Sequence, residues 1–182
     1  MKRAAIILAE GFEEIEALTP VDLLRRAGIS VQIVGLESSQ ITGARGVLVT
    51  ADILFHELDS ELDVVILPGG MPGSRNLAKH KGLQDLLLKR NKEKKLLAAI
   101  CAAPALVFGS LGILHGKKYT CYPGMESKVE GGQYSTEAVV KDGNILTSRG
   151  VGTAILFSLE IIRLLLGDEK SRDVSRDCLI HG

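Results

Sequence analysis

The feature that most constrains the fold is a regular alternation of short apolar segments with helix-periodic segments along the whole chain. The apolar segments carry no polar alternation, which is typical of strands buried on both faces; they span residues 4–9, 31–36, 64–67 and 96–100. Helices are expected at residues 13–27, 74–80, 83–92, 103–111, 153–166 and 169–179. This order predicts an α/β protein in which helices cover both faces of a mostly parallel central sheet.

Two further segments, residues 46–54 and 139–146, have the character of hairpins. We expect them to add antiparallel strands, so that the sheet is mixed at its edges. No linker or repeat interrupts the 182 residues, and 46% of them are hydrophobic, which is enough for a full core. A single domain over residues 1–182 is therefore predicted.

Composition excludes several classes of partner. The 22 basic and 22 acidic residues cancel, so no positively charged surface that would bind a nucleic-acid backbone is expected. Aromatic residues make up only 4% of the chain, so no surface for stacking nucleic-acid bases is expected either. The longest apolar stretch, residues 154–166, is shorter than the roughly 20 residues of a membrane span. Cys101, Cys121 and Cys178 are odd in number and lack metal-ligand spacing. We predict a cytoplasmic protein with reduced thiols and no metal, nucleic-acid or membrane partner.

Ligands of open parallel sheets gather at the carboxyl ends of the strands, which directs attention to the turns at residues 10–13, 68–73 and 101–104. Cys101 directly follows a buried strand and precedes a helix that Pro104 helps to start. This is the position of a nucleophile elbow, where a helix N-terminus favours the thiolate. The alternative is a small buried cysteine without chemistry.

Glu16 lies in the middle of an apolar helix stripe formed by Pro20, Leu23, Leu24 and Ala27. A carboxyl group buried there without a cation has a raised pKa and is a candidate for a functional site. The alternative is a structural carboxyl group held by a backbone or interface partner. The glycine-rich turn at 68–73 lacks the pattern of a phosphate-binding loop, so no cofactor is expected; it could present backbone N–H groups to an oxyanion or be only a turn.

Five segments, taken together and in this order, resemble the ThiJ/PfpI superfamily, and within it the DJ-1 branch: AEGFEEIE at 9–16, PVDLLRRAG at 20–28, VILPGG at 65–70, AAICAAP at 98–104 and LTSRG at 146–150. The resemblance implies a flavodoxin-like three-layer sandwich, related to the class I glutamine amidotransferase domain, and a homodimer. By the same resemblance, Cys101 matches the elbow cysteine of the family and Glu16 the acid that hydrogen-bonds it. The backbone amides of Gly69, Gly70 and Ala102 match the oxyanion hole.

Other positions follow from the resemblance alone. Arg26 and Arg45 match arginines near the dimer interface and the mouth of the site, and Tyr122 stands where many members carry a histidine. None of the histidines, His56, His80, His115 and His181, is assigned to the site. The glutamine amidotransferase activity is excluded, because it needs a His-x-Glu motif and His181 is followed only by Gly182.

The resemblance implies a cofactor-independent glyoxalase or protein deglycase, whose substrate is a small methylglyoxal-type dicarbonyl or a glycated molecule. Cys101 would attack the aldehyde carbon while Glu16 moves the proton, and the two groups would share one proton as thiolate and carboxylic acid. The first alternative is an oxidative-stress sensor or chaperone that works through oxidation of Cys101. A cysteine peptidase is disfavoured, because Tyr122 in place of histidine leaves no group to protonate a leaving amine.

Overall fold

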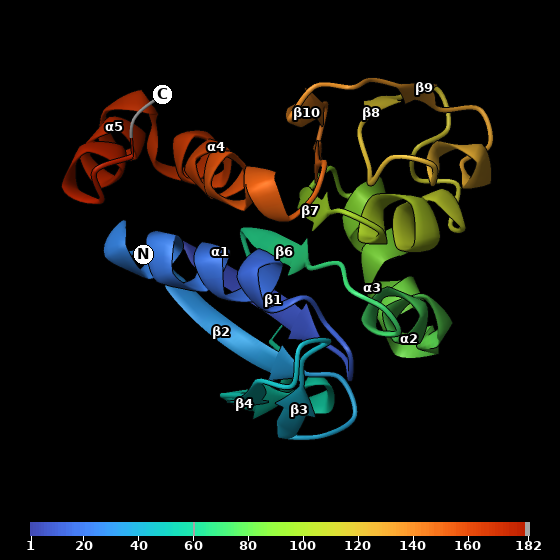
Figure 1. Cartoon of the computed structure of the whole chain (residues 1–182), viewed down its shortest axis with the longest axis horizontal. Helices are drawn as coiled ribbons and strands as arrows, with labels where there is room; N and C mark the ends of the chain where they lie inside the picture. Colours follow the sequence, from blue (N-terminus) through green and yellow to red (C-terminus); the bar gives the residue numbers. More distant parts are fainter. Residues whose placement is uncertain (60, 181–182) are drawn as a thin grey trace.

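The computed structural model describes residues 1–59 and 61–180. Its central sheet has the strand order β10-β11-β7-β6-β1-β2-β5 (Figure 1). All neighbours are parallel except β10 and β11, which confirms the mostly parallel sheet. The strands are β1 (Arg3–Leu8), β2 (Ser30–Gly35), β5 (Ile53–Leu54), β6 (Val64–Leu67), β7 (Leu96–Ile100), β10 (Val139–Asp142) and β11 (Ile145–Ser148).

Helices lie on both faces of this sheet, as predicted (Figure 1). One face carries α1 (Glu14–Arg26), α4 (Ala154–Leu166) and α5 (Asp168–Asp177); the other carries α2 (Gly73–Lys79), α3 (Lys81–Lys92) and the π-helix η2 (Pro104–Gly109). Successive strand residues alternate between the two cores, so Ile6 packs under α1 and Ile7 under the opposite helices. Among the described residues, no helix is long and apolar enough to cross a bilayer.

The remaining elements are short. They are β3 (Gln40–Thr42), β4 (Leu48–Thr50), β8 (Lys118–Tyr119), β9 (Gln133–Tyr134), and the 3-10 helices η1 (Phe55–Glu57), η3 (Glu126–Lys128) and η4 (Val151–Thr153). The helix expected at 103–111 is observed as the shorter π-helix η2.

The prediction of a hairpin at 46–54 that extends the central sheet is wrong. β4 pairs with β3 in a separate two-stranded sheet, while β5 joins the central sheet parallel to β2. The reason lies in Asp52, whose carboxylate accepts the backbone N–H of Ile33 (2.8 Å) and whose own N–H donates to the Ile33 carbonyl (2.8 Å). Beside Ile33 in β2, the Asp52 carboxylate thus accepts the N–H that a neighbouring strand would otherwise bind. The mixed edge expected at 139–146 is present as β10 and β11.

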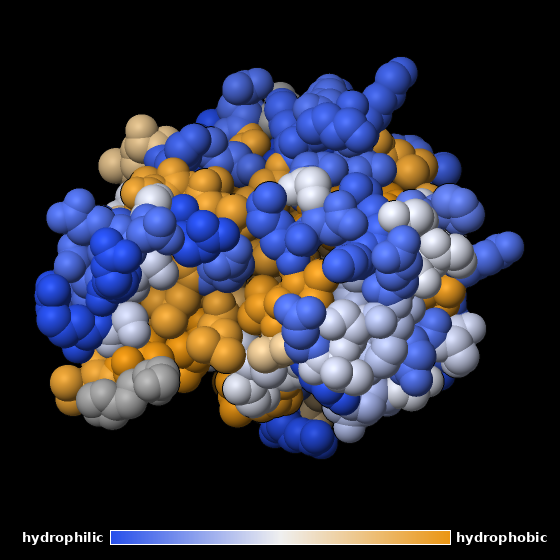
Figure 2. Space-filling view, turned by 90° about the horizontal axis from the view of Figure 1, so that it is seen from above, coloured by the Kyte–Doolittle hydropathy of each residue, from blue (hydrophilic) through white to orange (hydrophobic). Residues whose placement is uncertain are grey.

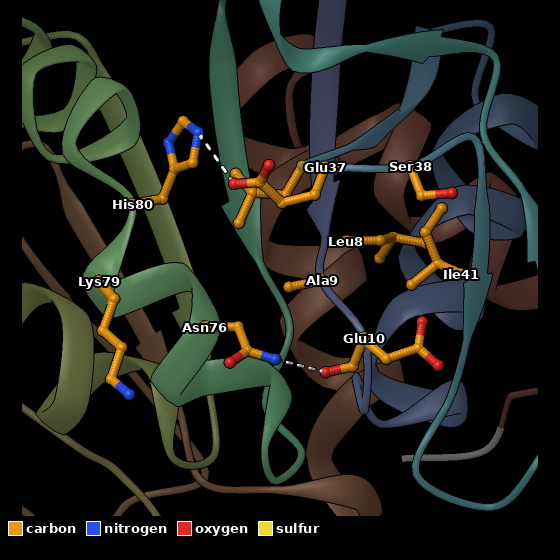
Figure 3. Close-up of a pocket in the computed structure, with 10 residues that line it drawn as sticks. Leu8, Ala9, Glu10, Glu37, Ser38, Ile41, Asn76, Lys79 and His80 are labelled. Carbon is orange, nitrogen blue, oxygen red and sulfur yellow. Dashed lines mark hydrogen bonds and ion pairs between the residues drawn. The ribbon is translucent and has the colours of Figure 1, made fainter.

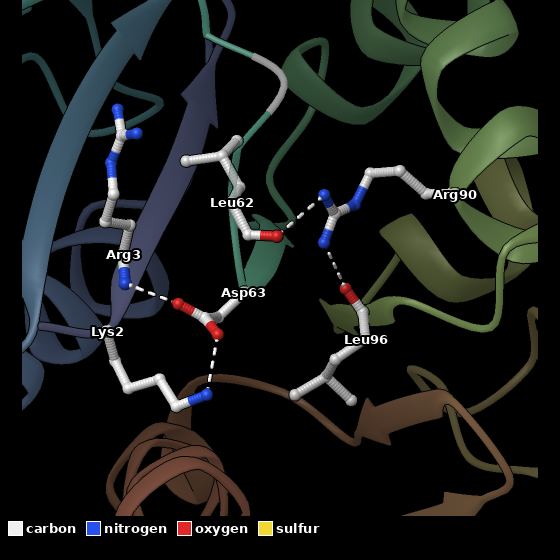
Figure 4. Close-up of polar contacts among 6 residues, drawn as sticks. All are labelled: Lys2, Arg3, Leu62, Asp63, Arg90 and Leu96. Carbon is white, nitrogen blue, oxygen red and sulfur yellow. Dashed lines mark hydrogen bonds and ion pairs between the residues drawn. The ribbon is translucent and has the colours of Figure 1, made fainter.

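Polar contacts hold the amino end of the sheet together (Figure 4). Arg90 is buried and donates to the carbonyl oxygens of Leu62 (3.1 Å) and Leu96 (3.2 Å), which precede β6 and begin β7. The Asp63 carboxylate accepts the backbone N–H of Arg3 (2.8 Å) at the start of β1. Three central strands are therefore fixed at one end, and their opposite ends carry the candidate site.

Candidate active site around Cys101

Cys101 occupies the turn between β7 and η2, and its backbone has a φ of +66°. A residue with a side chain rarely adopts this left-handed conformation, so the surrounding contacts must hold it. Two hydrogen bonds do so: the Cys101 N–H donates to the Ser148 carbonyl (3.0 Å), and the Cys101 carbonyl accepts the N–H of Tyr122 (2.8 Å). The sulfur is thereby presented at the carboxyl end of the sheet, where β7 lies beside β6 and β6 beside β1.

Glu16 lies in the first turn of α1 and is 0% exposed. The N-cap of this helix is Glu13, whose carboxylate accepts the backbone N–H of Glu16 (2.8 Å). Glu13 therefore caps the helix, and the Glu16 side chain, which is not needed for capping, is buried in the protein. Its Oε2 accepts the N–H of Gly69 (2.9 Å), whereas its Oε1 has no hydrogen-bond partner among the described residues. Burial raises the pKa of Glu16 to about 7, although a hydrogen bond with the Cys101 thiol opposes the rise.

The two side chains converge beside Gly69. A Cβ atom at Gly69 would overlap Oε2 of Glu16 and would lie 3.1 Å from the sulfur of Cys101, so only glycine leaves room for both groups. Burial, followed by the charge of the Glu16 carboxylate, raises the pKa of Cys101. The lowered pKa expected from a helix N-terminus is therefore not found, because desolvation outweighs the backbone donors. The thiol and the carboxyl group form one coupled pair.

Backbone amides face the sulfur. The N–H groups of Ala102 and Gly70 form hydrogen bonds with Cys101 that oppose the rise of its pKa. Gly70 has a φ of +92°, and a Cβ atom there would overlap the backbone of residues 11–13, which explains the need for glycine. The Gly69 amide, expected in the same group of donors, is instead committed to Glu16. Two amides, rather than three, remain for a developing oxyanion.

Tyr122 and Gly150 border the same place. The Tyr122 side chain is 52% exposed, and a Cβ atom at Gly150 would lie 3.6 Å from its Cδ2 atom and 4.0 Å from Oε1 of Glu16. Sequence reasoning named Tyr122 but attached no role to Gly150. Two signals could have indicated it: its position two residues after the carboxyl end of β11, and its place as the last residue of the matched segment at 146–150.

Arg26 and Arg45 do not meet Cys101 within this chain. Arg26 lies in the last turn of α1, ten residues or about 15 Å from Glu16, and pairs with Asp22 at 2.9 Å. Arg45 is exposed, and only its backbone N–H is anchored, to Oε1 of Glu14 (2.6 Å). Their predicted place at the dimer interface and the mouth of the site stays a prediction, because a single protomer does not show what these side chains meet across an interface.

Among the histidines that the structure describes, none is a group that shifts the pKa of the Cys101 thiol. The His80 ring accepts the Leu83 N–H at Nδ1 (3.0 Å), and its Nε2 lies 3.5 Å from Glu37. It borders a separate cavity of about 300 Å³ at the ends of β1 and β2, which sequence reasoning missed (Figure 3). His181 lies outside the described residues. Within the described ranges, no three His, Cys, Asp or Glu side chains gather as a metal site would require.

The fold and the site define a flavodoxin-like α/β protein with a cysteine at a strand-to-helix turn and a buried acid beside it. The sequence model of the DJ-1/PfpI family matches residues 2–164. The chain belongs to the DJ-1/PfpI family, as its motifs predicted.

Individual relatives are similar over nearly the whole chain. Glutathione-independent glyoxalase DJR-1.2 of Caenorhabditis elegans is 34% identical over 177 residues, which cover 95% of this chain and 94% of the relative. The crystal structure of Drosophila melanogaster DJ-1beta superposes with a TM-score of 0.95 at 39% identity and covers 100% of this chain and 99% of its own. Protein DJ-1 homolog B of Arabidopsis thaliana is 41% identical over 96% of this chain, but the chain spans only 40% of that relative's length.

Proposed function

We propose that the chain is a cofactor-independent glyoxalase, or a deglycase of the same chemistry, that converts methylglyoxal-type dicarbonyls into 2-hydroxy acids. The observation that carries the proposal is the coupled pair of Cys101 and Glu16, a buried acid whose pKa lies near 7 beside a thiol that faces two backbone amides. An acid of this pKa both gives and takes protons at neutral pH. The C. elegans relative, which is named a glutathione-independent glyoxalase, supports the same reaction class.

The nucleophile is the thiolate that forms when Glu16 holds the shared proton. The raised pKa of Cys101 argues against a free thiolate, but part of that rise comes from the Glu16 charge, which disappears when Glu16 is protonated. The sulfur then forms a bond with the aldehyde carbon C1, and the carbonyl electron pair moves to its oxygen. The amides of Gly70 and Ala102 stabilise that oxygen until it takes the proton from Glu16.

The internal redox step follows from the same carboxylate. Glu16 removes the proton of C1, the electron pair forms a C1–C2 double bond and displaces the C2 carbonyl pair onto its oxygen, and an enediolate forms. Glu16 returns a proton to C2 while the C1 hydroxyl proton is transferred to the C2 oxygen, so C1 is oxidised to a thioester and C2 is reduced to an alcohol. Water cleaves the thioester, releases lactate and restores Cys101, so methylglyoxal and water give lactate without an external oxidant.

The test is lactate formation from methylglyoxal, followed by nuclear magnetic resonance. Cys101→Ser and Glu16→Gln are each expected to lower kcat/KM by at least about 100-fold, because one loses the nucleophile and the other the proton carrier. Cys178→Ser is the matched control, since this thiol lies at the C-terminal end of α5, and its activity should equal that of the wild type. Retained activity in Glu16→Gln would contradict the mechanism.

A second candidate function is a peroxide sensor. Cys101 is partly exposed whereas Cys121 is buried, and the unpartnered Oε1 of Glu16 could donate a hydrogen bond to a sulfinate. Two molecules of peroxide would supply the two oxygen atoms and leave as water. Selective addition of two oxygens to Cys101 in a wild-type chain that does not consume methylglyoxal would favour this function, and mass spectrometry measures it. Peptidase activity is not proposed.

We propose that the chain acts in the cytoplasm as a homodimer. A groove of about 690 Å³ runs between α1, α4 and the segment after α5. Figure 2 shows hydrophobic residues in a band through the middle of one face of the molecule, bordered by hydrophilic residues. Exposed apolar residues that line the groove are Ile15, Ile155 and Leu179. Light scattering should give twice the chain mass, and Ile155→Glu should give monomers. A monomeric wild type would contradict this assembly.

A further inference from the structure

Gly150 leaves a small space beside the reacting groups. A Cβ atom at this position would be in ordinary van der Waals contact with the Tyr122 ring (3.6 Å) and with Oε1 of Glu16 (4.0 Å). The φ of Gly150 is 165°, which is extended backbone that any residue adopts. The backbone conformation therefore does not require glycine at this position. The effect of glycine here is that it leaves room next to the Tyr122 ring and Oε1 of Glu16.

The two oxygens of Glu16 have different surroundings. Oε2 accepts the N–H of Gly69, so it is held as an acceptor, whereas Oε1 is buried and without a partner among the described residues. Oε2 lies on the side of Gly69 and Cys101, so Oε1 is the oxygen that is left to exchange a proton with a bound substrate. Oε1 is also the oxygen that faces Gly150. A buried polar atom without a partner is costly, which indicates that a ligand group completes its hydrogen bonding.

Resting on the proposed glyoxalase reaction, we infer that Gly150 is a specificity-determining residue. The carboxyl group that takes a proton from C1 must return one to C2, so C2 has to lie beside Oε1. The substituent on C2 then occupies the space between Oε1, the Tyr122 ring and Gly150. The substrate class is α-oxoaldehydes, and the size of the C2 substituent is limited by this space.

The experiment compares kcat/KM for glyoxal, methylglyoxal and phenylglyoxal, whose C2 substituents are hydrogen, methyl and phenyl. Gly150→Ala should lower the ratio of phenylglyoxal to glyoxal at least about tenfold, because one methyl group fills the space. Tyr122→Ala should raise the same ratio, since it removes the opposite wall. Gly152→Ala is the matched control: no atom lies within 4 Å of its Cβ position, so its ratio should equal that of the wild type.

The outcomes separate the inference from the proposed function. If the wild type turns over these aldehydes and Gly150→Ala leaves the ratio unchanged, the specificity role is wrong and the glyoxalase function stands. If the wild type turns over none of the three, the proposed function fails and the inference fails with it. If thermal melting shows that Gly150→Ala does not fold, Tyr122→Ala tests the inference instead. An unchanged ratio of kcat/KM for phenylglyoxal to glyoxal in Tyr122→Ala would then overturn it.

Discussion

Removing the Glu16 carboxyl group should stabilise the protein, and by an amount that depends on pH. The pKa of Glu16 is raised from its ordinary 4.5 to about 7 by burial, so between these values the native state holds a proton that the unfolded chain has released. Stability therefore falls as pH rises from about 4.5 to about 7 and is constant above. At 1.36 kcal/mol per pH unit, the penalty above pH 7 is about 3 kcal/mol. Glu16→Gln keeps an acceptor for the Gly69 N–H without this penalty.

The assay is urea unfolding of the wild type and Glu16→Gln at a series of pH values from 5 to 8. The difference in unfolding free energy between the two proteins should grow by about 2.5 kcal/mol in favour of the variant over this range, because a small part of the penalty is already present at pH 5. Taking the difference cancels other titrating groups. Cys101→Ala serves as a second reference: it loses the hydrogen bond that lowers the pKa of Glu16, so its decline in stability should extend to higher pH. A constant difference from pH 5 to 8 would refute the reasoning.

Three further predictions concern activity and stability. The rate of methylglyoxal turnover should rise with pH around a midpoint near 7, because the pair of Cys101 and Glu16 must lose one proton before it contains a nucleophile; a profile that is flat from pH 6 to 8 would contradict this. Gly70→Ala should lower kcat/KM by about 10²-fold or more and reduce the melting temperature, since its Cβ atom overlaps backbone and displaces an oxyanion donor; kinetics equal to wild type would exclude the donor role. Arg90→Met should cost about 2 kcal/mol in urea unfolding, because two buried carbonyl groups lose their donor; a loss below about 0.5 kcal/mol would show that water replaces the guanidinium.

The sequence allowed much of this architecture to be predicted, because the decisive signals are local. Continuous apolar runs marked the parallel strands, and a carboxyl group on an apolar helix stripe marked Glu16 as buried. The edge at β5 was not predictable, since it depends on the side chain of Asp52 replacing a strand partner. The dominance of desolvation in the raised pKa of Cys101 also escaped prediction, because desolvation is a property of the packed protein and not of the turn.

The commitment of the Gly69 amide to Glu16 could be recognised only in three dimensions, because 53 residues separate the two groups. The same holds for Gly150, whose importance comes from an absent side chain next to an oxygen far away in sequence. Arg26 and Arg45 show the opposite case. Arg26 lies within one of the five matched segments and Arg45 lies outside them, and neither match specifies which neighbours the residue contacts.

The two backbone hydrogen bonds of Cys101 have a consequence for how this site can evolve. One ties the cysteine to Ser148, two residues before Gly150, and the other ties it to Tyr122 itself. Backbone hydrogen bonds therefore connect the Cys101 turn directly to the segments on both sides of the proposed substrate space. A change in loop length at either segment would shift the sulfur, whereas exchange of a single side chain would not. New substrate preferences in this lineage should accordingly arise by point substitution and seldom by insertion or deletion.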